Sequence, residues 1–225
     1  MNNTRNAVVI GGSGGGGGGG LSYTVNSGRD HPANVTSFTL PPVSTILSNA
    51  FMNWSSLVDV TIPDGLTTIG RTAFGNCSSL SAIVLPDGVT TIGSSAFSQC
   101  TSLVSVVIPN SVTTIEYFTF SGCTSLASVT IPNGVTTITE GCFSACTSLA
   151  SVVIPNGVTT IEYSAFESCS SLMELTVLAS TPPSLFDYAL DGVPANCSIR
   201  VPAESVAAYK AAAIWSDRAA YITAI

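Results

Sequence analysis

Seven cysteines are the side chains through which this sequence could most readily do chemistry. Five of them recur at intervals of 23 residues, each three positions before a leucine in an apolar column: Cys77, Cys100, Cys123, Cys146 and Cys169. We expect these thiols to be buried and to act as small hydrophobic side chains. Neighbouring ladder positions could be close enough to bridge, yet five thiols in one row cannot all pair, so structural free thiols are the preferred interpretation.

Metal binding and catalysis have little support. Cys142 and Cys146 are four residues apart, but the chain has one histidine, His31, in an irregular segment outside the repeats, so no zinc site and no cofactor are expected. The acidic residues of the coil corners could be interpreted as paired carboxylates, but a repeat corner offers no cleft and a solvated rim is expected. They are Asp64, Asp87, Glu116, Glu140 and Glu162. No catalytic residue is predicted, and the protein is expected not to be an enzyme.

Charge excludes two classes of partner. Only 8% of the 225 residues are charged, against a usual value of about 25%. The formal net charge is −7, with 13 acidic and 6 basic residues. Nucleic-acid binding needs a cationic surface that this composition lacks, and so does binding to anionic lipid. No apolar run approaches the roughly 20 residues of a membrane span, so membrane insertion is not expected.

Four residue columns repeat with one 23-residue step and define the organisation of the chain. The leucine column runs from Leu57 to Leu172, the proline column from Pro63 to Pro155, and the phenylalanine column from Phe51 to Phe166, beside the cysteines. The unit is L-x-x-[VI]-x-[IL]-P-[DN]-G-[VL]-T-T-I-x-x-x-x-F-x-x-C-[ST]-S. The Val-x-Ile stretch predicts a strand, Pro-Asp/Asn-Gly a corner, and the Phe-x-x-Cys-x-x-Leu spacing a short 3₁₀ or α turn.

These units predict a leucine-rich-repeat solenoid of about six coils, mostly short parallel strands with 3₁₀ or short helical turns. Coils stacked at the strand spacing would give a rod roughly 30 Å long. The expected divisions are an N-terminal segment with a glycine-rich tail at 1–20, an N-terminal cap and irregular first coil at 21–56, regular repeats at 57–172, and a C-terminal cap at 173–225. In that cap we expect a last strand at 197–201 and a helix at 203–215 that lays Val206, Tyr209, Ala213 and Trp215 over the open end of the last coil.

The repeats resemble a known family. The run IPNGVTTITEGCFSACTSLASVVIPNGVTTIEYSAF is similar to the BspA-like leucine-rich repeats of bacterial surface proteins, and the tail IRVPAESVAAYKAAAIWSD is similar to the cap that closes such arrays. The resemblance covers residues 38–225. It implies surface display and adhesion, and it brings no catalytic motif. An export signal and a sorting segment are not visible in this sequence, which leaves open whether the location is a cell surface or a virion or other assembly.

Two surfaces are candidates for binding. The predicted binding face is the outward strand column with Val84, Val107, Thr130 and Val153, an unusually apolar stripe that equally fits plain strand propensity. Thr61 and Thr176 continue this column at its ends. A secondary patch pairs tyrosine with carboxylate in alternate coils; it could contact a glycan or peptide, but an exposed corner is the preferred explanation. Its residues are Glu116, Tyr117, Glu162 and Tyr163.

Two functions follow as hypotheses. The first is a non-enzymatic binding or adhesion module for a protein or glycan. The second is a structural component of a larger assembly, such as a virion fibre or decoration protein, anchored through its N-terminus. Residues 11–20 contain nine glycines and one serine, which fits either a flexible linker or glycine strands packed together in a homo-oligomer, a trimer if they bundle.

Overall fold

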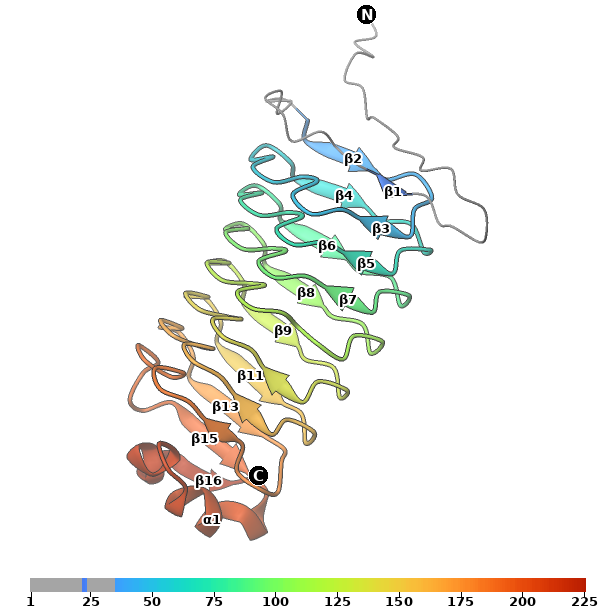
Figure 1. Ribbon diagram of the computed structural model, residues 1–225. Helices are drawn as coiled ribbons and strands as arrows, with labels where there is room; N and C mark the ends of the chain where they lie inside the picture. The colour runs from blue at the N-terminus through green and yellow to red at the C-terminus, as the bar shows by residue number, and fades with distance from the viewer. Residues whose placement is uncertain (1–21, 24–34) are drawn as a thin grey trace, which may run out of the picture.

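The computed structural model describes residues 22–23 and 35–225, and these residues form one continuous stack of coils closed at its C-terminal end by a short helical segment (Figure 1). Each coil contributes a strand to a longer ladder and a two-residue strand to a second ladder. Every strand pair is parallel, as expected when the chain returns to the same side once per coil. The predicted solenoid is confirmed.

The first ladder forms one long side of the solenoid. Its strands are β2 (Ser37–Thr39), β4 (Asp59–Thr61), β6 (Ala82–Val84), β8 (Ser105–Val107), β9 (Ser128–Thr130), β11 (Ser151–Ile154), β13 (Glu174–Val177), β15 (Ser198–Val201) and β16 (Ile222–Ala224). The second ladder contains β1 (Ser22–Tyr23), β3 (Thr45–Ile46), β5 (Thr68–Ile69), β7 (Thr91–Ile92), β10 (Thr137–Ile138), β12 (Thr160–Ile161) and β14 (Ser184–Leu185).

The stack is longer than the expected six coils and has about eight turns. The regular step is visible where Ser105 of β8 pairs with Ser128 of β9. The stack continues past Met173 because one extra residue is accommodated there: Glu174 of β13 pairs with Ser198 of β15, a step of 24. At the other end Ser37 pairs with Asp59, a step of 22, which agrees with the shorter first coil expected from the sequence. The pairing of Ser22 with Thr45 extends the second ladder into residues 21–37, although residues 24–34, the glycine run and His31 lie outside the described residues.

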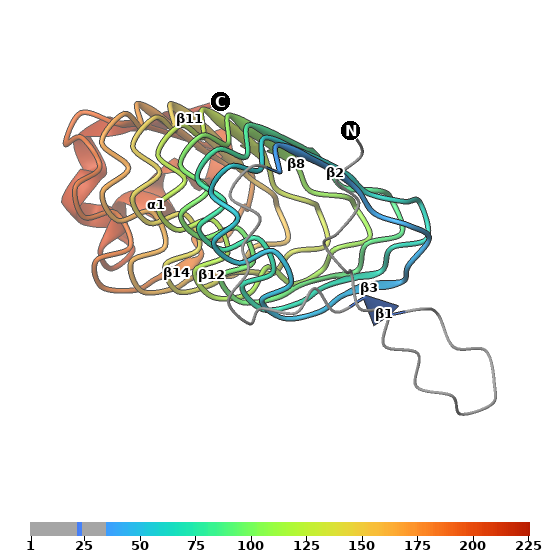
Figure 2. The same cartoon turned by 90° about the horizontal axis from the view of Figure 1, so that it is seen from above.

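The coils lie one behind another along the solenoid (Figure 2), and the core consists of columns in which each side chain packs on its equivalent in the next coil. The phenylalanine rings from Phe51 to Phe166 are stacked nearly parallel, with centroids 5.0 to 5.6 Å apart and interplanar angles of 2° to 10°. The leucine column is fully buried beside them. A single coil could not bury these side chains, so burial requires the stack.

The third side of each coil differs from the helical turn that the sequence suggested. It is a run of consecutive turns in which alternate residues reach out to the next coil. The N–H groups of Thr72, Phe74 and Asn76 donate to carbonyls 22 residues later, whereas Ala73 and Gly75 donate three residues back within their own coil. This alternation forces every fourth residue into the left-handed region, at φ 54° for Thr72 and 60° for Asn76. A helix would have kept those hydrogen bonds inside one coil, so it could not have joined the coils.

The C-terminal cap covers the last coil with three short elements. They are η1 (Ala203–Ser205), α1 (Val206–Ala211) and η2 (Trp215–Tyr221). The single helix expected over 203–215 is therefore wrong beyond Ala211, because Ala212 turns to an extended conformation with ψ 145°. That break directs the indole N–H of Trp215 to the carbonyl of Pro183, at 2.8 Å, and buries the ring beside Tyr209. Val206 is half-buried as the cap prediction required, but Ala213 is exposed.

The left-handed positions generate a stability prediction. Thr72 is β-branched at φ 54°, a conformation that costs an L-residue about 1–2 kcal/mol, while asparagine tolerates it better. We expect Thr72→Asn to raise the free energy of unfolding by about 1 kcal/mol in denaturant titration. Thr113 is exposed and has no positive φ, so Thr113→Asn is the matched control and should change stability by less than about 0.5 kcal/mol. Equal effects of the two substitutions would contradict the proposed strain.

Candidate functional site

The outward side of the first ladder, called the strand face from here on, exposes the valines that the sequence singled out. It consists of the outward side chains of β4, β6, β8, β9, β11 and β13. Val84 is 82% exposed, Val107 68% and Val153 51%, and Thr130 is exposed between them. The intervening residues, such as Ile83 and Val106, point into the core, so the alternation places every second side chain outward. The predicted face therefore exists as one surface, although its role in binding stays a prediction.

Two shallow hollows lie on the strand face, where the first ladder is interrupted. No strand pairing joins β4 to β6 or β9 to β11 in the described part of the chain. A hollow of about 320 Å³ lies at the first interruption and is lined by residues that include Thr61, Ile62 and Val84. A second of about 240 Å³ lies at the other interruption and contains Thr130 and Val153. Three of the four predicted face residues thus line hollows, which the repeat pattern alone did not indicate.

Charge is confined to the two ends of the strand face. The middle coils present Ser105, Ser128 and Ser151 beside the valine column. Asp59 and Asp64 lie at the first hollow, and at the other end Glu174 and Arg200 form an ion pair at 3.9 Å. An uncharged centre with hydroxyl groups loses little solvation when a partner covers it, because no unpaired charge is buried.

The secondary patch is not one surface. Tyr117 and Tyr163 are exposed at 46% and 47%, but they lie two coils apart, with Glu140 at the corresponding position of the coil between them. The Glu162 carboxylate is fixed in position, because its Oε2 accepts a hydrogen bond from the backbone N–H of Glu140 at 3.0 Å. The structure instead adds Phe118, Phe186 and Tyr188 to the same corner of the coils. The sequence gave no signal for Phe186, since one inserted residue shifts it out of the 23-residue step.

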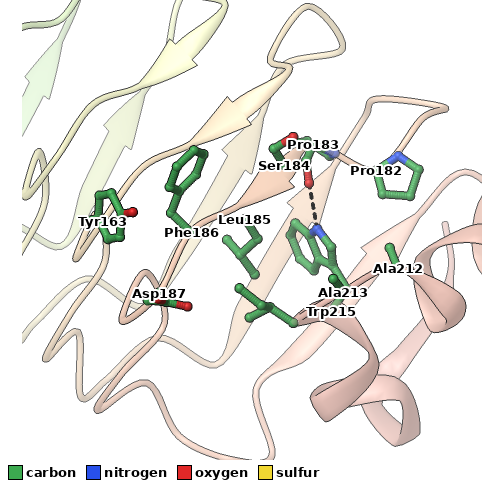
Figure 3. Close-up of a pocket in the computed structure, with 11 residues that line it drawn as sticks. Tyr163, Pro182, Pro183, Ser184, Leu185, Phe186, Asp187, Ala212, Ala213 and Trp215 are labelled. Carbon is green, nitrogen blue, oxygen red and sulfur yellow. Dashed lines mark hydrogen bonds between the residues drawn. The ribbon is translucent and has the colours of Figure 1, made fainter.

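A cavity of about 450 Å³, called the cap cleft, lies between that corner and the C-terminal cap (Figure 3). Tyr163 and Phe186 stand on one side of it, in edge-to-face contact with ring centroids 5.0 Å apart. The segment from Ala212 to Trp215 forms the other side. Burial raises the pKa of Tyr209, in the cap, to about 12, and its hydroxyl donates to the carbonyl of Ala179 at 2.8 Å, so this tyrosine is a structural support.

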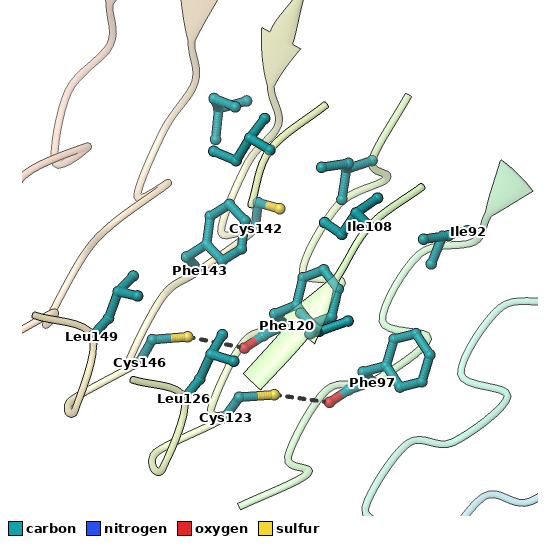
Figure 4. Packing of buried hydrophobic residues seen from close by; sticks show 14 of the residues in the cluster. Ile92, Phe97, Ile108, Phe120, Cys123, Leu126, Cys142, Phe143, Cys146 and Leu149 are labelled. Carbon is teal, nitrogen blue, oxygen red and sulfur yellow. Dashed lines mark hydrogen bonds between the residues drawn. The ribbon is translucent and has the colours of Figure 1, made fainter. Parts of the chain in front are cut away.

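The ladder cysteines are buried free thiols, as the sequence predicted. They are also hydrogen-bonded: each Sγ–H donates to the carbonyl of the phenylalanine 26 residues earlier, as for Cys123 and Phe97 at 3.2 Å (Figure 4). Desolvation raises the pKa of Cys77, Cys123 and Cys169 to about 12. A neutral, buried and hydrogen-bonded thiol is a poor nucleophile, so these side chains connect coils rather than react.

The other groups considered for chemistry are scattered. Asp64, Asp87 and Glu140 are exposed and Glu116 and Glu162 half-buried, one in each successive coil. Burial raises the pKa of Cys142 and its thiol lies in the core. Within the part of the chain that the structure describes, no three His, Cys, Asp or Glu residues gather as metal ligands, and no helix is long and apolar enough to cross a bilayer.

Comparison with known proteins agrees with the fold. The sequence matches the BspA type leucine-rich repeat region in six copies, over residues 31–110 and 67–189. A leucine-rich repeat protein of T. pallidum is similar at 33% identity and TM-score 0.64, over 78% of this chain and 83% of that one. A leucine-rich repeat protein of Eubacterium ventriosum is 28% identical with TM-score 0.60, over 77% of this chain and 48% of that one. One from Bacteroides ovatus is 26% identical with TM-score 0.50, over 74% of this chain and 55% of that one. Among curated proteins, no sequence similar to this chain was found.

The thiol geometry generates a reactivity prediction. With pKa values raised from 9.0 to about 12, the folded thiols hold their protons at pH 9, where ordinary thiols are half ionised. We expect a disulfide reagent added at pH 9 without reductant to label the folded protein very slowly, and to label all seven cysteines after unfolding in guanidinium. Prompt labelling of the folded protein would contradict the buried ladder. Fewer than seven labelled cysteines in the unfolded protein would indicate disulfides.

Proposed function

The chain belongs to the BspA-type leucine-rich repeat family, and we propose that it is a non-enzymatic module that binds a protein partner through its strand face. The observation that carries the proposal is the exposure of Val84 and Val107, at 82% and 68%, on a flat strand ladder. Exposed apolar side chains gathered in one stripe favour contact with another protein.

The make-up of the strand face supports this proposal in three ways. The valine column supplies apolar area, and the neighbouring serines and threonines can donate and accept hydrogen bonds at the rim of an interface. The two hollows beside Val84 and Val153 can each receive a side chain of the partner. Because the centre of the strand face is uncharged, a partner can cover it without burying an unpaired charge.

Adhesion at a surface is the setting that we propose for this binding. The resemblance to repeats of bacterial surface proteins supports it, and so does a surface built from serine and threonine instead of charged residues. A glycan is the second class of ligand that the same face could hold, through its hydroxyl groups and hollows. The experiment below separates the two ligand classes.

Replacement of the exposed valines tests the proposed face. We expect Val84→Glu with Val107→Glu and Val153→Glu to weaken binding at least about tenfold, because each glutamate must be desolvated against the partner. Binding is measured against an array of purified extracellular proteins and a glycan array. Val104 is the control: it is 51% exposed, as is Val153, but it lies outside the strands, immediately before β8, so Val104→Glu should leave binding unchanged. Unchanged binding of the triple variant to every hit would overturn the face, and loss of glycan hits alone would favour the glycan.

The second candidate function is a structural component of a larger assembly, such as a virion fibre or decoration protein. The sequence observation that favours it is the run of nine glycines within residues 11–20. Chains joined by packed glycine strands would form a defined oligomer, a trimer if the strands bundle. The strand face would then serve the assembly and not a host ligand.

Solution mass separates the two functions. We expect light scattering to give the mass of a single chain both for the full chain and for one starting at Leu21 if the binding-module proposal holds. A defined oligomer that becomes a monomer on removal of residues 1–20 would favour the assembly component instead. An oligomer that survives the truncation would place the contact between copies on the solenoid itself.

A further inference from the structure

We propose that the cap cleft is a second binding site, which receives an arginine or lysine side chain from a basic, extended segment of a protein partner. The site lies at the corner beyond the second ladder, away from the strand face, and does not depend on the function proposed for that face.

Exposed aromatic side chains gather at one corner of the solenoid. Tyr117, Phe118, Tyr163, Phe186 and Tyr188 lie there, and among the described residues only Tyr221 is a comparably exposed aromatic elsewhere. Stacking does not demand them, because the same two positions of earlier coils hold Arg71 and Thr72, then Ser94 and Ser95. An aromatic side chain left in water at an unconstrained position favours a role in contact with a ligand.

The cap cleft turns part of this corner into a concave site. Tyr163 and Phe186 present their rings at one side, and Leu185 and Trp215 lie deeper, almost fully buried (Figure 3). The volume of about 450 Å³ is within the usual range for a small-ligand site, so it can hold a long side chain with part of its backbone. The aliphatic part of an arginine or lysine would lie along the apolar walls while its cation meets the rings.

The one charged side chain among the residues that line the cleft is negative. Asp187 lines the cleft and makes no ion pair with any residue that the structure describes. Glu162 is adjacent in the chain to Tyr163. No basic residue lines the cleft. In the cap, the Arg218 guanidinium donates to the carbonyls of Pro194, Leu190 and Val193, and Lys210, two residues before Ala212, is exposed and does not line the cleft. A cation between an aromatic face and a carboxylate is attracted by both groups.

The far wall of the cleft is held in a strained conformation. Ile214 has φ 66° and ψ −41°, and the N–H of Trp215 donates to the carbonyl of Ala213 at 2.8 Å, which together make a γ-turn with positive φ. Such a turn is rare, and a β-branched residue at its centre is costlier still. Strain of this kind persists only where the surroundings fix it, here the bond from the Trp215 indole to Pro183. The wall is therefore positioned before any ligand arrives, which lowers the entropy lost on binding.

A basic segment fits the cleft better than a sugar does. Among the polar side chains that line the cleft, the Asp187 carboxylate only accepts hydrogen bonds, and the Tyr163 and Ser184 hydroxyls can both donate and accept. Sugar hydroxyls need donors as well as acceptors, whereas guanidinium and ammonium groups only donate. The net charge of −7 further favours the approach of a cationic partner.

The test uses the full chain and a fluorescein-labelled peptide, Gly-Ser-Arg-Gly-Arg-Ser-Gly, followed by anisotropy. The reference peptide carries citrulline in place of both arginines, which keeps the shape and removes the charge. We expect the arginine peptide to bind and to weaken as salt is raised, and the citrulline peptide to bind at least tenfold more weakly. Equal binding of the two peptides, or no binding of the arginine peptide up to millimolar concentration, would overturn the proposal.

Matched variants place the binding at the cleft. Asp187→Asn and Tyr163→Leu should each weaken the arginine peptide several-fold or more. Tyr117→Leu changes an equally exposed tyrosine at the same position two coils away, and should have no effect. If Tyr117→Leu weakens binding as much as Tyr163→Leu, the peptide is held by the acidic surface in general and the proposal fails. If Tyr163→Leu removes hits on a glycan array but leaves peptide binding intact, the cleft is a sugar site instead.

The strand-face variant keeps the two proposals apart. The triple substitution of Val84, Val107 and Val153 to glutamate should leave peptide binding at the cap cleft within twofold of the unchanged protein. If the triple variant gives the unchanged protein's hits on the protein array, the strand-face proposal fails, and peptide binding at the cap cleft is unaffected by that result. Loss of the peptide in the triple variant would contradict a site confined to the cap cleft.

Discussion

Each coil of this solenoid depends on backbone hydrogen bonds that it cannot make within itself. On the third side, N–H groups such as those of Thr72 and Phe74 donate to the next coil, and the parallel ladders do the same on the other two sides. A buried backbone group left unpaired costs about as much as a lost hydrogen bond, so every coil must sit in one register against its neighbour. That requirement explains why the sequence repeats every 23 residues. It also explains why the phenylalanine rings stack and why the cysteines form one column. The need for a cap follows from it too, because the last coil has no neighbour to accept its bonds.

The sequence predicts the inward side chains of this fold well because each belongs to a column. Phe74, Cys77 and Leu80 are recognisable as core residues from their copies 23 residues away, and the outward position of Val84 follows from strand alternation. The spacing of apolar residues is less informative where two backbone conformations would produce the same spacing. The phenylalanine-to-cysteine stretch fits a helical turn by its apolar spacing, yet alternate hydrogen bonds to the next coil require left-handed residues there. Phe118 and Ser164 have a positive φ, but their residue types do not indicate it. A glycine at these positions would have indicated it.

Departures from the step were harder still to anticipate. One residue inserted after β12 moves Leu185 and Phe186 out of their columns, so the coil from β13 to β15 resembled a cap when judged by sequence. The end of α1 was missed for another reason. Ala211, Ala212 and Ala213 have high helix propensity, but the burial of Trp215 and its bond to Pro183 outweigh that preference. At the cap a tertiary contact decides the structure, and no local sequence pattern indicates that contact.

The same reasoning explains where concave sites can occur on such a molecule. A perfectly regular stack presents a smooth surface, because each outward side chain meets an equivalent one above and below it. Hollows need a break in the regularity, and three hollows lie at such breaks: the interruptions of the first ladder between β4 and β6 and between β9 and β11, and the junction with the cap. The first two lie on the strand face beside Val84 and Val153, and the third lies beside Tyr163 and Phe186. Because core columns are constrained to be alike, it is the outward residues at these irregular places that can differ from coil to coil and give the surface specificity.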